Sequence, residues 1–384
     1  MRTEIATFTD DEARLLVHRA GGTPTFAYSR DTLRESVRRV RSASVRGAGI
    51  YYSLKANPHP GVVNTLAGLV DGFDVCSVAE LEIALNSGMP PENVLFTGPA
   101  KSRSEALTAL AAGVPVTVES PGQARLFAEV ARELDVPARA VVRLNMPYPA
   151  RTTGGPVSPN QFGVSDDDFA EVAEILGGSL VGLQVFWGSQ YFDADVILGA
   201  RKAVLDRARE LGEKFGLTWD FLSLGGGIAM PWRDTEPEIE WSGLEAAGLT
   251  ELEDSPARTV VCEYGRAVVG PAGSLITTVL DTKTVDGRRY VLVDAGMNHL
   301  MIASRLIAGS GRGEASVRAV GGSGAGRATV TGPLCSQLDV LAEDVELPEV
   351  VPGDLLVFSG VGGYGPSFSP AGFLSREPAR EVVY

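Results

Sequence analysis

The hydrophobic pattern between residues 49 and 264 alternates short apolar runs with longer amphipathic ones. Eight runs rich in β-branched and aromatic residues begin near residues 49, 72, 93, 115, 139, 181, 221 and 259. Helical patterns fill most of the gaps, and the clearest covers residues 194–216, where apolar positions recur near a helical period opposite Arg and Glu. Strands that alternate with helices in this way predict a (β/α)8 barrel. A doubly wound parallel sheet is the alternative, which the strand count alone leaves open.

After residue 270 the pattern changes to strands without long helices between them. Five such runs are "GSLITTVLDTK", "RRYVLVDAG", "SVRAV", "ATVTG" and "DLLVFSG", separated by turn-rich pieces such as "VPGD". A further strand, "TPTFAYS" near residue 23, is expected to pair with them. We therefore predict a barrel over residues 28–270 and a mostly β domain built from residues 1–27 and 271–384, which contributes to the active site and to a dimer interface.

Composition and charge narrow the possible partners. The chain has 384 residues, 44% of them hydrophobic, and a net charge of −14, which argues against a nucleic-acid groove or an anionic membrane surface. No signal-peptide pattern and no membrane-spanning apolar run is seen. The three cysteines form no CxxC pair and the three histidines are scattered, so a cytoplasmic protein without a metal site is expected.

Functional groups in a (β/α)8 barrel lie at the carboxyl ends of the strands. The first strand, "IYYSL", ends in Lys55 and is broken at once by Asn57 and Pro58. The other residues of interest at these ends are Asp74, Arg143, Gly225, Gly226, Gly227, Glu263, Gly265 and Arg266. Taken singly, a strand-end lysine is most often a solvated charge, three glycines a tight loop, and a Glu with a nearby Arg a structural ion pair. Their joint occurrence at one barrel end favours a chemical role.

The triple glycine does not fit a dinucleotide fingerprint, because Met230 stands where the last Gly or Ala is needed. Its backbone N–H groups remain suited to binding one phosphate. An amine nucleophile, a phosphate site and a carboxylate for a heteroaromatic nitrogen are what a pyridoxal 5′-phosphate (PLP) enzyme needs. We expect Lys55 to form the Schiff base, Gly225–Gly227 and Arg266 to bind the phosphate, and Glu263 to keep the ring nitrogen protonated.

The same motifs resemble the fold-type III PLP-dependent decarboxylases, which share an alanine-racemase-like barrel and include the ornithine, diaminopimelate and arginine decarboxylases. The motifs are "YYSLKANPHP", "GFDVCSVAEL", "WGSQ", "SLGGGI", "CEYGRAVVGPAG", "GPLCSQLDVL" and "GDLLVFSGVGGYG". The resemblance places Asp74 and Gly265 among the cofactor-binding residues and brings Ser189 and Tyr364 to the phosphate. It also implies a head-to-tail homodimer with shared active sites, in which Cys335 of the neighbouring subunit protonates Cα.

Two departures from that family pattern bear on the substrate. Phe186 stands where the basic-amino-acid decarboxylases place a histidine that stacks on the cofactor ring. Ser336 follows Cys335 where an acidic residue normally pairs with the substrate's distal amine. A branch that acts on modified amino acids, or on amino acids linked to acyl-carrier proteins in secondary metabolism, is more similar. We expect Arg143 and Ser336 to contact the substrate. The roles of His299, which at a strand end is more often a plain structural residue, and of the loop 146–160 stay open.

The resulting prediction is α-decarboxylation of an amino acid or a derivative through an external aldimine and a quinonoid carbanion. A racemase of the same fold is one alternative, which Glu263 disfavours because racemases place Arg at the ring nitrogen; Tyr264 and Tyr364 keep it in consideration. A non-catalytic homologue that regulates a decarboxylase is the other. The presence of both Lys55 and the glycine loop disfavours it.

Overall fold

The computed structural model describes residues 5–146, 160–231, 237, 239–247, 255–308, 316–322, 324 and 326–384. The chain divides into two compact units. The first comprises Val37–Ala229 and Ile239–Gly265, and the second comprises Arg2–Ser36, Met230–Glu238 and Arg266–Tyr384. The predicted domain limits at residues 28 and 270 stay a prediction, and the predicted loop 146–160 lies almost wholly outside the described residues.

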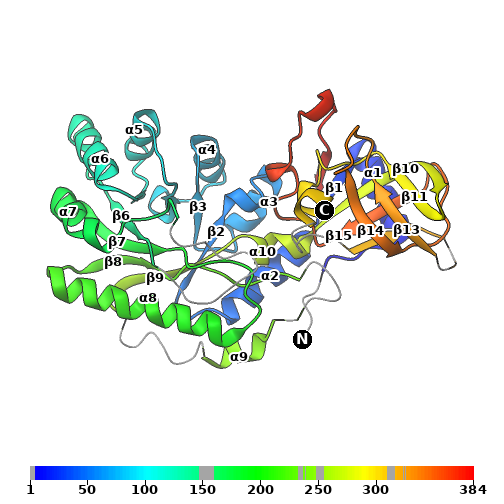
Figure 1. Ribbon diagram of the computed structural model, residues 1–384. Coiled ribbons are helices and arrows are strands. Elements are labelled where there is room, and N and C mark those ends of the chain that lie inside the picture. The colour runs from blue at the N-terminus through cyan, green and yellow to red at the C-terminus, as the bar shows by residue number, and fades with distance from the viewer. Residues whose placement is uncertain are drawn as a thin grey trace. The chain divides into compact units, whose positions relative to one another are not determined.

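The first unit is a closed barrel of parallel strands in the order β2-β3-β4-β5-β6-β7-β8-β9, which confirms the predicted (β/α)8 architecture (Figure 1). The strands are β2 (Gly49–Ser53), β3 (Gly72–Val75), β4 (Val94–Phe96), β5 (Val116–Val118), β6 (Ala140–Leu144), β7 (Leu180–Val185), β8 (Trp219–Ser223) and β9 (Ala257–Tyr264). Each begins within two residues of its predicted start. The alternation of apolar runs with amphipathic ones therefore specified the strand order.

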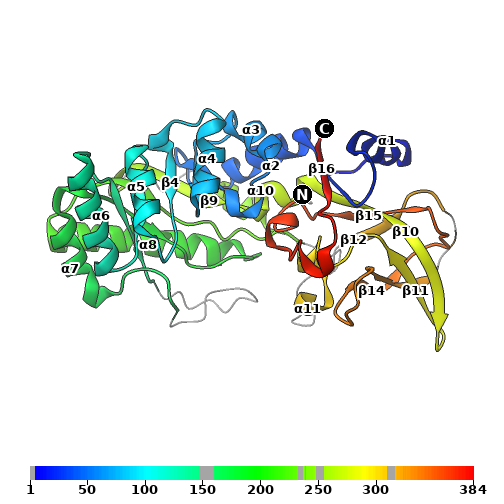
Figure 2. The same cartoon turned by 90° about the horizontal axis from the view of Figure 1, so that it is seen from above.

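Helices surround these strands, as Figures 1 and 2 show. They are α2 (Arg30–Ser42), α3 (Pro60–Ala67), α4 (Val78–Asn86), α5 (Arg103–Ala111), α6 (Pro121–Leu134), α7 (Asp166–Leu176), α8 (Ala194–Phe215) and α9 (Trp241–Ala247). The predicted helix at 194–216 is α8, whose first turn is capped by the Asp193 side chain and whose end is closed by left-handed Gly216. No described helix has the length and apolarity that a membrane span requires.

Hydrophobic side chains fill the barrel one layer below its carboxyl-terminal mouth. Tyr51, Leu95, Val141 and Val261 form a buried cluster, with Phe221 packed against it. They come from β2, β4, β6, β9 and β8. Because side chains in a strand alternate between faces, the residue two positions further along points the same way. This apolar layer therefore supports the polar groups that follow it on the same strands.

The second unit is a mostly β domain, as predicted. Among the described residues its strands run in the order β12-β15-β10-β11-β13-β14, and β1 lies between β10 and β16. They are β1 (Thr25–Tyr28), β10 (Gly273–Val285), β11 (Arg288–Val293), β12 (Ser316–Ala319), β13 (Arg327–Thr331), β14 (Val340–Glu346), β15 (Leu355–Ser359) and β16 (Arg380–Val383). The strand near residue 23 does pair with this domain. Short helices α10 (Arg266–Val269) and α11 (Arg305–Ala308) also belong to this unit.

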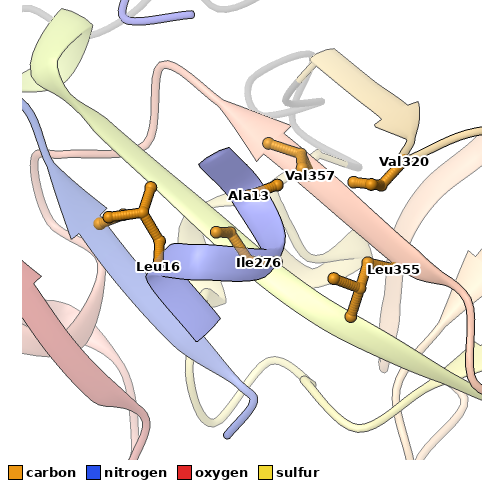
Figure 3. Close-up of a cluster of buried hydrophobic side chains, with 7 residues drawn as sticks. Ala13, Leu16, Ile276, Val320, Leu355 and Val357 are labelled. Atoms are coloured by element: carbon orange, nitrogen blue, oxygen red, sulfur yellow. The ribbon is translucent and has the colours of Figure 1, made fainter. Parts of the chain in front are cut away.

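Helix α1 (Asp10–Ala20) packs on this sheet through a small apolar stripe. Figure 3 shows the side chains of the stripe beside those of β10 and β15, and the contacting residues are Ala13, Leu16, Ile276, Leu355 and Val357. Thr9 caps the helix together with Glu12. Helix α1 and strands β14 and β16 were not predicted from the sequence.

Candidate active site

A ring of polar side chains lines the carboxyl-terminal mouth of the barrel, one from each strand or from the residues directly after it. The ring consists of Lys55, Asp74, Thr97, Glu119, Arg143, Gln184, Ser223 and Glu263. Three of them, Thr97, Arg143 and Glu263, follow the apolar cluster residues of their own strands by two positions. The apolar cluster thus packs beneath the ring, on the side away from the mouth.

Lys55 lies in a 3-10 turn, Leu54–Ala56, directly after β2. The Tyr52 hydroxyl donates to the carbonyl of Asn57 at 3.0 Å, and the Asn57 side chain accepts from the N–H of His59 at 2.9 Å. Pro60 then occupies the first position of α3, where its missing N–H costs nothing. The unusual sequence after Lys55 therefore fixes the backbone that presents this lysine.

The Lys55 ammonium pairs with the carboxylate of Asp74 on β3. The distance between Nζ and Oδ2 is 3.4 Å, and the Lys55 side chain is 46% exposed whereas Asp74 is 1% exposed. Thr97 donates to the other Asp74 oxygen at 2.6 Å, and the Sγ of Cys76 lies 3.2 Å from the Thr97 hydroxyl. Burial raises the pKa of Cys76 to about 11, so this thiol stays protonated. Asp74 is thereby oriented toward an amine that remains accessible.

Glu263, near the end of β9, is held by donors from two neighbouring strands. Ser223 of β8 donates to Oε1 at 2.7 Å, and the Gln184 amide of β7 lies 3.2 and 3.0 Å from the two carboxyl oxygens. Withdrawal from water, followed by the nearby Asp74 carboxylate, raises the pKa of Glu263 to about 7. A cation bound at the mouth would reverse this shift, so Glu263 is suited to holding a protonated ring nitrogen.

This shift predicts a pH-dependent stability for the protein without cofactor. The folded pKa of Glu263 lies above its ordinary value of 4.5, so the folded state keeps this proton longer than the unfolded chain. Stability from this group is therefore lost as pH rises from about 4.5 to about 7. We expect Glu263→Gln to gain about 3 kcal/mol relative to wild type on going from pH 4.5 to pH 8. Urea unfolding at both pH values measures this, with exposed Glu213→Gln on α8 as the matched control; an equal difference at both pH values would contradict it.

The three glycines after β8 form a backbone surface that side chains would obstruct. A Cβ on Gly226 would lie 1.9 Å from the carbonyl oxygen of Glu263, and one on Gly227 would lie 2.3 Å from the Trp187 ring. Gly225 and Gly227 also have positive φ values of 67° and 88°. The N–H groups of Gly226 and Gly227 donate to no other described residue. They remain available for an anionic ligand such as a phosphate.

Arg143, near the end of β6, lies between two aromatic rings. Its Cζ lies 4.6 Å from the Phe162 ring centroid and 5.7 Å from that of Phe186. Glu119 accepts from Arg143 at 3.4 Å and also from the N–H of Gly163 at 2.9 Å. Phe186 is 37% exposed, so its ring is accessible for stacking on a planar ligand.

Two further residues predicted to bind the cofactor also follow barrel strands. Ser189 lies in the loop after β7, and Gly265 comes directly after β9.

Within the second unit the structure brings together Arg266 and Tyr364. The Arg266 Cζ lies 4.5 Å from the Tyr364 ring centroid, and Tyr364 has a positive φ of 60°. A small, partly open hollow is lined by Arg266, Ile302, Ala303, Ser359, Gly360, Val361 and Gly363. The predicted phosphate contacts from this unit are therefore neighbours.

Cys335 and Ser336 lie on the turn between β13 and β14. Cys335 is exposed, and the turn is braced by buried Asp339, which accepts from the N–H groups of Leu334 at 2.8 Å and Met297 at 2.6 Å. His299 is buried nearby: its Nδ1 accepts from the N–H of Gly296, and its Nε2 lies 2.8 Å from the carbonyl of Glu377. Burial lowers its pKa, which supports the structural role expected for it.

A second lysine, Lys101, lies near the mouth and was not predicted from the sequence. Lys101 is 7% exposed, and its Nζ donates to the carbonyls of Gly98 and Thr117 at 2.6 and 2.7 Å and to the Thr117 hydroxyl at 3.0 Å. Burial lowers the pKa of Lys101 to about 8. All three of its protons are engaged, so Lys101 links the residues after β4 to strand β5 by hydrogen bonds.

Within the described ranges no three His, Cys, Asp or Glu side chains converge to hold a metal ion.

The fold is a (β/α)8 barrel whose mouth carries an accessible lysine and an unobstructed glycine backbone. The model of the family "Pyridoxal-dependent decarboxylase, pyridoxal binding domain" matches residues 30–270. The diaminopimelate decarboxylase of Helicobacter pylori (strain J99) is 32% identical, over 90% of this chain and 87% of that protein. The L-glutamyl-[BtrI acyl-carrier protein] decarboxylase of Niallia circulans is 28% identical, over 94% of this chain and 88% of its own.

A solved structure of a decarboxylase is similar to this chain over almost its whole length. The crystal structure of Helicobacter pylori diaminopimelate decarboxylase complexed with L-lysine has a TM-score of 0.84 and 29% identity, and the match covers 96% of this chain and 93% of that one. The chain therefore belongs to the fold-type III PLP-dependent decarboxylases, and PLP is its cofactor. The residues present fit that group. The glycine surface leaves room and N–H donors for a phosphate, and the buried Glu263 carboxyl is suited to pairing with a protonated ring nitrogen.

Proposed function

We propose that this protein removes the α-carboxylate of an amino acid or amino-acyl derivative, using PLP attached to Lys55. The strongest support is that three groups suited to this chemistry lie at one mouth of the barrel. An accessible amine paired with Asp74, an unobstructed glycine backbone and a carboxyl with two fixed donors occur there together. A racemase would need a cation where Glu263 stands.

When bound, PLP supplies an electrophilic aldehyde and a ring that accepts electrons. In this proposal the Lys55 amine is the attachment point, and its ion pair with Asp74 holds it at the mouth. Glu263 holds a proton at the ring nitrogen, and Phe186 covers one ring face. Gly225–Gly227 bind the phosphate together with Ser189 and Gly265, and the family pattern assigns Arg266 and Tyr364 to the phosphate as well.

The substrate is proposed to carry no free distal amine. Ser336 is neutral where the family pattern has an acid, and a diamino acid would lose a charged contact of about 1.5–3 kcal/mol. Arg143, partly neutralised by Glu119, is proposed to contact the substrate. The Niallia circulans relative, which is named for a glutamyl group on a carrier protein, supports a carrier-linked or acylated amino acid.

We also propose a homodimer in which Cys335 of one copy protonates Cα at the barrel mouth of the other. The exposed position of Cys335 on a braced turn supports this. Sedimentation of the PLP-loaded protein at micromolar concentration is expected to give the mass of two chains. A fully active single chain would contradict this part of the proposal.

A decarboxylation screen by mass spectrometry tests the function. Free ornithine, lysine, arginine, diaminopimelate and glutamate are compared with carrier-linked and N-acylated forms, in deuterated water. We expect release of carbon dioxide and one deuterium at Cα of the product, with the carrier-linked or acylated forms turned over faster than the free diamino acids. Deuterium incorporation with retained carboxylate would indicate a racemase, and no turnover of any compound would favour a non-catalytic homologue.

A further inference from the structure

Gln184 is the polar residue of β7 in the ring, and its amide reaches both oxygens of Glu263. The distances from Nε2 are 3.2 and 3.0 Å, and strand register places Gln184 directly beside Ser223, the second donor. Ser223 is itself tied to the glycine surface, because it accepts from the N–H of Gly225 at 3.2 Å. Two adjacent strands thus fix the carboxyl group from the same side.

The other end of the same amide is left unsatisfied. Gln184 is 3% exposed, and its Oε1 has no hydrogen-bond partner among the described residues. A buried acceptor without a partner destabilises the folded state, because its hydrogen bond to water is lost and not replaced. Methionine has a similar length and volume and would occupy this position without that cost. Stability alone therefore does not account for an amide here, whereas its contact with Glu263 does.

The charges around Glu263 show what the amide opposes. Exclusion from water and then Asp74 on β3 favour the protonated carboxyl, and Lys55 after β2 favours the ionised one. Tyr51 below it on β2 also faces Glu263 and is protonated, because burial raises its pKa to about 12. Arg143 lies beside Gln184 in the strand register. Of the uncharged groups, only donors such as Gln184 and Ser223 stabilise the ionised form by direct contact.

We propose that Gln184 is a positioning residue that holds Glu263 ionised and oriented toward the mouth, where a protonated heteroaromatic nitrogen binds. Its amide donates to the side of the carboxylate that faces β7, so the remaining lone pairs of Glu263 face the ligand. This role rests on the proposed function, because the ligand is the cofactor of that function. The contact between Gln184 and Glu263 is present in the protein without cofactor.

The test is a carbon-13 NMR titration of Glu side-chain carboxyls in the cofactor-free protein, with the Glu263 signal assigned from Glu263→Gln. We expect Gln184→Met to raise the midpoint of Glu263 by about one pH unit, since one hydrogen bond to a charged group is lost. Gln184→Leu serves as a second variant if the first does not fold, and Gln184→His, which restores an N–H donor, should return the midpoint part of the way. The matched control is Gln123→Met, a buried amide that contacts Pro99 and Glu119 instead.

A second readout separates positioning from a structural role. Gln184→Met is expected to leave the melting temperature of the cofactor-free protein at pH 6 unchanged or higher, because the unsatisfied carbonyl is removed. An unchanged Glu263 midpoint in a folded Gln184 variant, or an equal shift in Gln123→Met, overturns the proposal. Failure of the wild type to bind PLP would instead count against the proposed function, because the titration needs no cofactor.

Discussion

Replacing Lys55 with alanine is expected to abolish turnover and the near-visible absorption of the lysine-bound cofactor. This change removes the accessible amine that is paired with Asp74 at the end of β2. Loss of a positioned nucleophile and proton carrier costs about 10³-fold or more in rate. Steady-state decarboxylation and the absorption spectrum of the PLP-loaded protein measure both effects.

The matched control for this change is Lys283→Ala. Lys283 is exposed on β10 in the second unit and belongs to no proposed site. Its removal should leave the spectrum and the turnover unchanged. Retention of the wild-type spectrum and rate in Lys55→Ala would refute the assignment of this lysine.

The second large effect is expected from Gly226→Ala. The added Cβ would lie 1.9 Å from the Glu263 carbonyl oxygen, which is backbone and cannot rotate away. We expect a loss of about 1–3 kcal/mol or more in unfolding free energy from overpacking. Displacement of the glycine surface should also weaken PLP binding by about 10- to 100-fold, the cost of one charge-assisted hydrogen bond.

Urea unfolding and a fluorescence titration with PLP measure these two quantities for Gly226→Ala. Gly68→Ala is the control, because a Cβ there meets nothing within 4 Å and the backbone needs no positive φ. It should match wild type in both measurements. Wild-type PLP affinity in a stable Gly226→Ala protein would show that the phosphate is bound elsewhere.

The sequence alone predicted the barrel and the parts of the site that strand ends determine. Lys55, Gly225–Gly227 and Glu263 each follow or end an apolar run, and parallel strands bring such ends to one mouth. Asp74 and Arg143 were predicted for the same reason. Arg266 follows Glu263 closely in sequence but belongs to the second unit, where its neighbour is Tyr364.

Other parts could not be predicted because their meaning depends on strand register. Gln184, Thr97 and Glu119 are single polar residues within or after strands, and only the register shows that they face Glu263, Asp74 and Arg143. A polar residue two positions beyond a buried apolar one was the signal that could have found Thr97. Strand β14 was missed because its second half carries acidic residues, and α1 because it buries only Ala13 and Leu16.

Borohydride reduction followed by peptide mapping tests the central claim most directly. Reduction fixes the cofactor to whichever amine holds it, and mass spectrometry of the digest identifies that residue. A pyridoxyl group on the peptide that contains Lys55, and on no other, is the predicted result. A label on Lys101, whose amine is buried beneath the same mouth, or on any other lysine would contradict it.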